Sequence, residues 1–273
     1  MPEGDTVWRA CHHLHEAMAG HVLTSTEFRV PRYATTDLGG QVLREVVPRG
    51  KHLLMRTDEW TIHSHLKMEG SWHLYRPATL RRGGRGLRRP AHTVRAIVST
   101  EEWVAVGFSL GVVEVLRRED EDTVVGHLGP DVLDPDFDRE LALDNLARQP
   151  ERPIFVALHD QRNLAGFGNE FVNEMLFLSA VDPRTPVADV DLGRVVDRGV
   201  KLIRLNRDRT ERSFTGSLRP GELHWVFGRA DRQCRRCGTT IREIALGPPT
   251  QERRVYFCPN CQAPSPASGG PDL

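Results

Sequence analysis

Two kinds of hydrophobic spacing divide this chain. Up to about residue 130, short runs rich in β-branched residues alternate with turn residues, which is typical of β-strands; the clearest runs are TIHSHL, TVRAIVS, WVAVGF and GVVEVL. One helical pattern precedes them over residues 5–19, where apolar side chains, Cys11 among them, recur at helical spacing. After about residue 136 the spacing becomes helical again and predicts helices over 139–148, 153–159, 169–178 and 187–205. We therefore expect a β-rich first part, a helical second part and a buried Cys11.

Three segments do not fit either spacing. LGPDVLDPDFD, over residues 128–138, has the proline and aspartate content of a linker, and it places a domain boundary near Asp136. The glycine- and arginine-rich run over residues 81–90 cannot build a core and is predicted to be a mobile loop. The tail APSPASGGPDL has a composition typical of disorder.

Composition adds the class of protein and a hint about its partner. The 273 residues are 39% hydrophobic and 27% charged, which is ordinary for a globular protein, and no apolar run or leader pattern predicts a membrane span or secretion, so we expect a cytoplasmic protein. The net charge is zero, yet residues 201–262 hold 13 basic against 6 acidic side chains, while residues 101–144 hold 3 against 13. This segregation fits either a basic face for a polyanion or two solvated surfaces without a partner.

Four of the five cysteines form two pairs with the spacing of a metal site. Cys234 and Cys237 lie in CRRC, Cys258 and Cys261 lie in CPNC, and 20 residues separate the pairs. Two such knuckles supply the four thiolates of tetrahedral zinc, in a closed site with no position left for water. The sequence therefore predicts one structural Zn²⁺, against the alternative of four unrelated reduced thiols.

The segment between the pairs contains two strand-like runs, IREIAL and RRVYF, that would form a hairpin. Arg253 and Arg254 begin the second run. An arginine on a metal-braced hairpin can bind a phosphate with its planar guanidinium, or it can simply be solvated, and the hairpin alone does not distinguish the two.

A glycine-rich turn joins two predicted helices in NLAGFGNEF, where Asn169 stands at the start of the second helix. Paired glycines allow positive φ and a close approach of a ligand, and the amides at a helix start favour phosphate. An ordinary turn between helices with an asparagine cap is the other interpretation.

The first residues suggest an amine nucleophile. Removal of Met1 would leave Pro2 as a free secondary amine, followed at once by Glu3. An α-amino group has a reference pKa of about 8, against about 10.4 for lysine, so it is far richer in free base at neutral pH and can form an iminium ion with a sugar carbon. Glu3 could transfer protons beside it. Many proteins begin in this way without such chemistry.

In combination these features resemble the formamidopyrimidine-DNA glycosylase/endonuclease VIII (Fpg/Nei) family. The motifs MPEGDT, RGKHLL, SHLKMEG, NLAGFGNEFVNE and RRVYFCPNCQ match the family in order and at suitable distances, over nearly the whole chain to Gln262. The resemblance implies an α+β multidomain fold: an N-terminal β-sandwich with flanking helices, a helical helix-two-turn-helix domain and a β-hairpin zinc finger. The β-sandwich domain would span residues 1–130, followed by a linker at 131–136. The helix-two-turn-helix domain would span 137–228, the zinc finger 229–262 and a disordered tail 263–273.

The resemblance also implies roles for single residues. Pro2 matches the nucleophile, Glu3 its proton-transfer partner and Lys51 an essential lysine on a hairpin. Asn169 and Arg253 match the phosphate clamp, and Arg253 would also assist elimination. The implied activity is a bifunctional DNA glycosylase and abasic-site lyase of base-excision repair, a monomer acting on damaged double-stranded DNA.

Departures from the family bear on the substrate. Met68 matches a position that inserts into the gap left by the flipped base, although it could equally be a core residue. The Arg-Phe wedge of the formamidopyrimidine branch is missing from VGFSLGVVEV, and RSFTGSLRPGELHWVFGR is short for the loop that covers 8-oxoguanine there. An arginine of some endonuclease VIII proteins is replaced by His127. These features and MPEGDT favour oxidised pyrimidines as substrates.

Two other functions compete with this one. A zinc-finger DNA-binding protein of the same fold without catalysis would keep the cysteines, Asn169 and Arg253 but would not need Pro2, Glu3 and Lys51 together. A tautomerase with an N-terminal proline would have no use for a zinc finger or a phosphate clamp.

Overall fold

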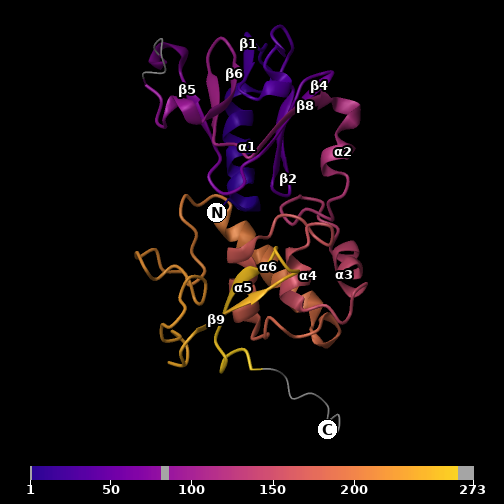
Figure 1. The fold of residues 1–273 in the computed structure, drawn as a ribbon, viewed down its shortest axis with the longest axis vertical. Helices are drawn as coiled ribbons and strands as arrows, with labels where there is room; N and C mark the ends of the chain where they lie inside the picture. Colours follow the sequence, from indigo (N-terminus) through magenta and orange to yellow (C-terminus); the bar gives the residue numbers. More distant parts are fainter. Residues whose placement is uncertain (1, 81–85, 264–273) are drawn as a thin grey trace. The chain divides into compact units, whose positions relative to one another are not determined.

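The computed structural model describes residues 2–80 and 86–263, and its contacts divide the chain into two compact units that meet in sequence at His127 and Leu128 (Figure 1). The predictions about Met1, about residues 81–85 of the arginine-rich loop and about residues 264–273 of the tail lie outside the described residues.

The first unit contains two four-stranded antiparallel sheets. One has the order β1-β6-β7-β5 and the other β2-β3-β4-β8. Their strands are β1 Ser25–Phe28, β2 Glu45–Arg49, β3 His52–Arg56, β4 Trp60–His65, β5 Ser71–Tyr75, β6 Val94–Ser99, β7 Val104–Phe108 and β8 Val112–Arg117. The four strand-like runs of the sequence correspond to β4, β6, β7 and β8, so their assignment is confirmed.

The larger of two apolar clusters in the described part of this unit lies between the two sheets, and a smaller one, with Val94, Val106 and Phe108, is formed on β5, β6 and β7. The core between the sheets combines inward side chains of both sheets, such as Phe28, Leu53, Ile62 and Val98, with Cys11 and its neighbours on α1 Gly4–Met18. Helix α1 packs against β2 and β3, and Figure 1 shows it in indigo alongside the strands. Cys11 is buried, as its helical spacing predicted.

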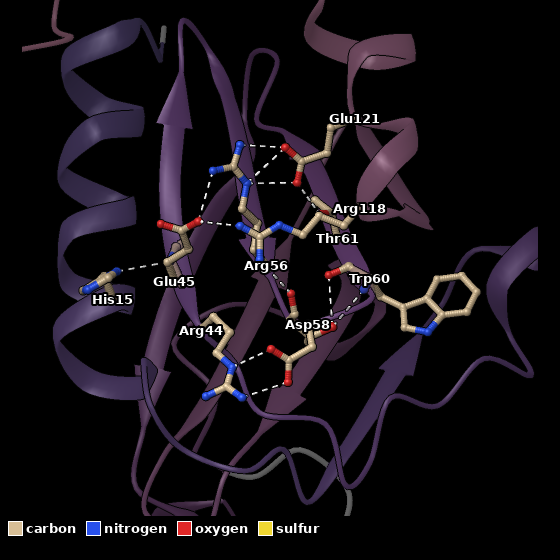
Figure 2. Close-up of polar contacts among 11 residues, drawn as sticks. His15, Arg44, Glu45, Arg56, Asp58, Trp60, Thr61, Arg118 and Glu121 are labelled. Atoms are coloured by element: carbon tan, nitrogen blue, oxygen red, sulfur yellow. Dashed lines mark hydrogen bonds and ion pairs between the residues drawn. The ribbon is translucent and has the colours of Figure 1, made fainter. Parts of the chain in front are cut away.

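The face of the second sheet away from this core carries many polar side chains, although the buried Leu54 also lies on it. Figure 2 shows Arg56 donating to the carboxylates of Glu45 and Glu121, while Arg118 also donates to Glu45. Thr61 completes the group by donating to Glu121. Glu121 immediately precedes α2 Asp122–Val125, so these ion pairs attach α2 to the sheet.

The second unit is helical and carries a β-hairpin. Its helices are α3 Arg139–Ala147, α4 Ile154–His159, α5 Asn169–Ser179 and α6 Leu192–Asn206, and its hairpin is β9 Arg242–Leu246 with β10 Arg253–Phe257. Helix α5 is buried on nearly all sides and packs against α4, α6 and β10. The predicted fold class, including the β-hairpin with four clustered cysteines, is confirmed.

One helix begins later than its hydrophobic spacing predicted. The expected helix over 187–205 is a short 3-10 turn at Val187–Asp189, a break, and then α6. The Asp191 side chain accepts a hydrogen bond from the amide of Arg194, and this N-cap fixes the start of α6 at Leu192. No helix among the described residues is long and apolar enough to cross a bilayer.

Candidate active site and nucleic-acid interface

Pro2 stands immediately before a rigid helix. Glu3 is the N-cap residue of α1, and its carbonyl accepts the amides of Thr6 and Val7, both at 3.1 Å. Glu3 is fully buried. The position of Pro2 is therefore set by the packing of α1 and not by a loose tail.

Lys51 occupies a two-residue turn between β2 and β3. Arg49 and His52 are the last paired residues of this hairpin, so Gly50 and Lys51 form its loop. Gly50 has φ +57°, which suits the first position of a type II′ turn and which only glycine adopts without strain. Since α1 packs against β2 and β3, the three sequence-predicted catalytic residues Pro2, Glu3 and Lys51 belong to one packed group of elements.

Met68 lies on the surface and not in the core. Its exposed fraction is 66%, and it follows Lys67, whose φ of +53° turns the chain between β4 and β5. The neighbouring turn, from β7 to β8, is closed instead: Leu110 is 6% exposed, and a Cβ on Gly111 would overlap the Lys67 side chain. Of these two turns, only the one with Met68 offers a large apolar side chain to a ligand.

Asn169 is the first residue of α5 and joins the glycine turn to the zinc-finger hairpin. Its Nδ2 donates to the carbonyl of Arg254 at 3.0 Å. One turn later, Asn173 accepts the amide of Tyr256 at 2.6 Å and donates to the carbonyl of Asn169. These bonds connect α5 to β10, so Asn169 and the first residues of β10 are held side by side.

Arg253, the first residue of β10, is exposed and lines a cavity of about 250 Å³. Arg152 and Arg162 line the same cavity, and both donate to Asp160. Although burial alone would raise it, the two arginines lower the pKa of Asp160 to about 2. Three arginines and one aspartate thus line this cavity, and this excess of positive charge favours an anionic ligand.

Glu174, a residue that was not predicted from the sequence, orders the segment before the finger. The carboxylate is fully buried and accepts the amides of Trp225, Val226 and Phe227 at 2.8–2.9 Å. Burial raises its pKa. Its place in NEFVNE was a signal, since a carboxylate on an otherwise apolar helix face needs partners.

The four predicted ligand cysteines come together in the structure. Their Sγ atoms all lie within 4.8 Å of one another, with Cys234–Cys261 at 3.9 Å and Cys237–Cys258 at 3.5 Å. Tetrahedral zinc with Zn–S bonds of about 2.3 Å requires sulfur atoms roughly 3.8 Å apart, so the set fits this ion. Backbone amides of Arg236 and Cys261 donate to sulfur atoms within the two knuckles.

The electrostatics of this cluster also point to a cation. Burial raises the pKa of the Cys258 and Cys261 thiols, whereas hydrogen bonding with Thr239 lowers the pKa of Cys237, so a positive charge is needed to hold all four sulfur atoms together as thiolates. The finger packs on α5 through an apolar cluster that includes Phe177, Val226 and Tyr256. The four-cysteine cluster thus belongs to the same packed finger as the hairpin that carries Arg253.

Comparisons with known proteins agree with this arrangement. Residues 1–108 match the formamidopyrimidine-DNA glycosylase N-terminal domain, and residues 128–197 match the H2TH domain of the same enzymes. A probable endonuclease 8 2 of Streptomyces coelicolor is 50% identical, over 99% of this chain and 97% of its own length. The DNA-(apurinic or apyrimidinic site) lyase Nei2 of Mycolicibacterium smegmatis is 45% identical, over 97% and 100%.

A solved structure agrees in fold at much lower identity. The Lactococcus lactis Fpg, in complex with DNA containing an abasic site, superposes with a TM-score of 0.76 at 23% identity, over 96% of this chain and 99% of that one. The two matched domains cover most of the chain and the first relatives match it from end to end. The chain therefore belongs to the formamidopyrimidine-DNA glycosylase/endonuclease VIII family.

Proposed function

We propose that this chain is a bifunctional DNA glycosylase and abasic-site lyase of base-excision repair that acts on oxidised bases, with pyrimidines favoured. The observation that carries the proposal is the packed group of α1, β2 and β3, because it combines an N-terminal proline, a buried glutamate and a hairpin lysine in one unit. The zinc-braced hairpin with Asn169 and Arg253 supplies the matching phosphate site.

In the proposed reaction, the free amine of Pro2 attacks C1′ of the damaged nucleotide. The bond from C1′ to the base breaks, and Glu3 and Lys51 transfer the protons that the departing base and the opening sugar require. The product is an iminium ion between Pro2 and C1′, which acidifies the neighbouring C–H bonds of the sugar.

Strand cleavage follows from that acidity. Loss of a C2′ proton expels the 3′ phosphate, and a second elimination expels the 5′ phosphate, with Arg253 assisting the second step. Water then hydrolyses the iminium and restores the amine. The zinc ion has no part in these steps; when bound it would stabilise the finger and orient Arg253.

The proposed clamp uses the donors that remain after internal bonding. The Asn169 amide nitrogen carries two protons, and its bond to the Arg254 carbonyl uses one, so the other can reach a phosphate. Arg253 adds a guanidinium from the neighbouring strand. Met68, on its exposed turn, would fill the gap left when the damaged base is rotated out of the duplex.

The preference for pyrimidines rests on what the chain lacks. Leu110 is buried in the closed β7–β8 turn, where the formamidopyrimidine branch has its wedge, and the segment over 212–229 forms short turns without a helix or strand. We further propose that the enzyme works as a monomer on damaged double-stranded DNA in the cytoplasm.

Borohydride trapping on a duplex with one abasic site tests the nucleophile. The wild-type chain should form a covalent adduct when reduced and, without borohydride, should cut the strand and leave 3′-phosphate ends. Pro2→Gly, and a chain in which Met1 is retained, should lose most trapping and cleavage while still binding the duplex, because the clamp residues are unchanged.

Full trapping and cleavage by the chain that retains Met1, in which the Pro2 nitrogen is a tertiary amide, would show that another group attacks C1′. Binding without trapping by the wild-type chain would instead favour a zinc-finger DNA-binding protein without catalysis. A panel of duplexes with single oxidised pyrimidines or purines then tests the substrate preference, which a faster excision of the purines would contradict.

A further inference from the structure

Histidines line the polar face of the sheet that carries Lys51. The strand register pairs His52 with His65 and His63 with Glu114, so these four side chains occupy two neighbouring rows on β3, β4 and β8. The residues next to them along the strands, such as Leu53 and Ile62, point to the opposite face and into the core. The cluster therefore lies immediately beside the Lys51 turn, because His52 is the next residue.

Three of these side chains form a hydrogen-bonded chain. The carboxylate Oε2 of Glu114 lies 2.8 Å from Nδ1 of His63, and Nε2 of His63 lies 2.8 Å from Nδ1 of His52. The two rings stack with centroids 5.0 Å apart. His63 is only 3% exposed, so its two bonds are made away from solvent.

The direction of the chain follows from the chemistry of its ends. An ionised carboxylate can only accept, so Nδ1 of His63 carries the proton that it donates to Glu114. In a neutral imidazole the other nitrogen is then an acceptor, so Nε2 of His63 accepts the Nδ1 proton of His52. His52 is left with the lone pair on its own Nε2.

The surroundings favour neutral rings. Burial, and the nearby His63, His65, His127 and Lys67, lower the pKa of His52 to about 3. Burial also lowers the pKa of His63, despite the opposing carboxylates of Glu114 and Glu121.

We propose that His52 is a positioning residue for Lys51, held by Glu114 through His63 in the tautomer that donates from Nδ1. The fixed, uncharged ring keeps the Lys51 turn in one conformation and adds no positive charge beside its ammonium group. This inference rests on the proposed role of Lys51 in proton transfer.

Nitrogen-15 NMR of the imidazole rings tests the chain without any reaction. At pH 7 the full-length protein should show His52 and His63 protonated at Nδ1, whereas exposed histidines mostly carry the proton at Nε2. In Glu114→Leu the preference should disappear in both rings. Protonation of His52 at Nε2 in the wild-type protein would overturn the proposal.

Steady-state cleavage of abasic-site DNA tests whether this histidine chain positions Lys51 for catalysis. His52→Phe, His63→Phe and Glu114→Leu should each lower kcat roughly 10- to 100-fold with little change in KM, since displacement of a reacting group has costs of that order. Glu114→Gln should recover most of kcat, because its amide oxygen still accepts from His63. Glu102→Leu, at an exposed acid of the same unit, is the matched control.

The outcomes separate this inference from the proposed function. If Lys51→Ala loses activity while His52→Phe and His63→Phe keep full kcat, only the positioning role is wrong. Full activity of Lys51→Ala would overturn both that role and the role of Lys51. Thermal unfolding identifies any variant that fails to fold, and His63→Gln then replaces His63→Phe.

Discussion

At the scale of single residues, adjacent arginines on β10 have different surroundings. Arg253 lines the basic cavity and lies beside Asn169, whereas the Arg254 side chain is 75% exposed and pairs with Glu243 on β9. Successive residues of a strand point to opposite faces, so the two side chains leave β10 in different directions. This pair offers an internal control for the proposed clamp.

We expect Arg253→Gln to weaken binding of abasic-site DNA and Arg254→Gln to leave it almost unchanged. Each phosphate contact that is lost should reduce the slope of log K against log salt by about 0.9. Titration of labelled duplex by fluorescence anisotropy at several salt concentrations measures both effects. Equal salt slopes for the two variants would show that Arg253 does not contact a phosphate, which would contradict its place in the clamp.

The histidines of the polar sheet face predict how stability depends on pH. His52 has its pKa lowered to about 3, mainly by burial, and His65 to about 4 for the same first reason, while both have about 6.5 when unfolded. Below pH 6.5 the unfolded chain therefore binds more protons than the folded one. The neutral rings therefore make their full contribution to the free energy of unfolding above pH 6.5. This contribution is lost as the pH falls toward the folded-state pKa values of about 4 and about 3.

Each of these histidines should lower the free energy of unfolding by up to about 2 kcal/mol between pH 6.5 and pH 5. Urea denaturation at pH 7, 6 and 5 measures the loss, and His52→Gln should make it shallower. His13→Gln, at an exposed position of α1, is the matched control. A stability that stays constant from pH 7 to pH 5 would contradict the prediction.

At the scale of elements, the β2–β3 hairpin shows how a local constraint positions a proposed catalytic group. Gly50 must have positive φ for the turn to present Lys51 between Arg49 and His52. Any other residue at this position would strain the backbone, and relief of that strain would move Lys51.

Gly50→Ala should therefore cost about 1–2 kcal/mol of stability and lower strand cleavage as well. Gly20→Ala is the comparison, because Gly20 also has positive φ, at +83°, but follows α1 at the far end from Pro2. We expect a similar loss of stability there with normal cleavage. Thermal unfolding measures the stability of each variant, and the abasic-site assay measures its strand cleavage. Equal cleavage by the two variants would show that the conformation of the Gly50 turn does not affect catalysis.

Elements with a regular pattern and distinctive chemistry could be predicted from the sequence. The cysteine pairs, the glycine turn and the alternation in β4, β6, β7 and β8 each have a local physical cause. Strands β2 and β3 were harder to predict, because β3 is apolar on both faces at Leu53 and Leu54 and so lacks clear alternation. The hydrogen-bonded histidines were missed because they depend on strand register, which joins positions 52, 63 and 114 only after folding.

At the scale of the whole molecule, the four-cysteine cluster and the fifth cysteine, Cys11, lie in different units. The four ligand cysteines belong to the second unit, as does Trp225, which stacks on Phe177 and contacts Arg236 of the first knuckle. Loss of the ion should therefore disturb Trp225 and the hairpin while leaving the first unit folded.

Native mass spectrometry should find one zinc ion per chain, and Cys258→Ser should lose it together with most DNA binding. Chelation should change the fluorescence of Trp225, isolated by subtracting the spectrum of Trp225→Phe. Cys11→Ser, at a buried thiol of the first unit, should keep the ion. Unchanged DNA binding after complete loss of zinc would contradict a structural role for the finger.

The division of the chain at His127 and Leu128 has a consequence for affinity. The proposed clamp residues Asn169 and Arg253 belong to one unit, whereas Pro2, Glu3 and Lys51 belong to the other, so a damaged strand is a bivalent ligand whose own backbone connects two sites. Once the clamp holds a phosphate, the strand presents its sugar to Pro2 at an effective concentration set by the stretch of strand that links them. Specificity can then arise from the geometry of the strand, because only DNA that reaches both sites at once gains this advantage.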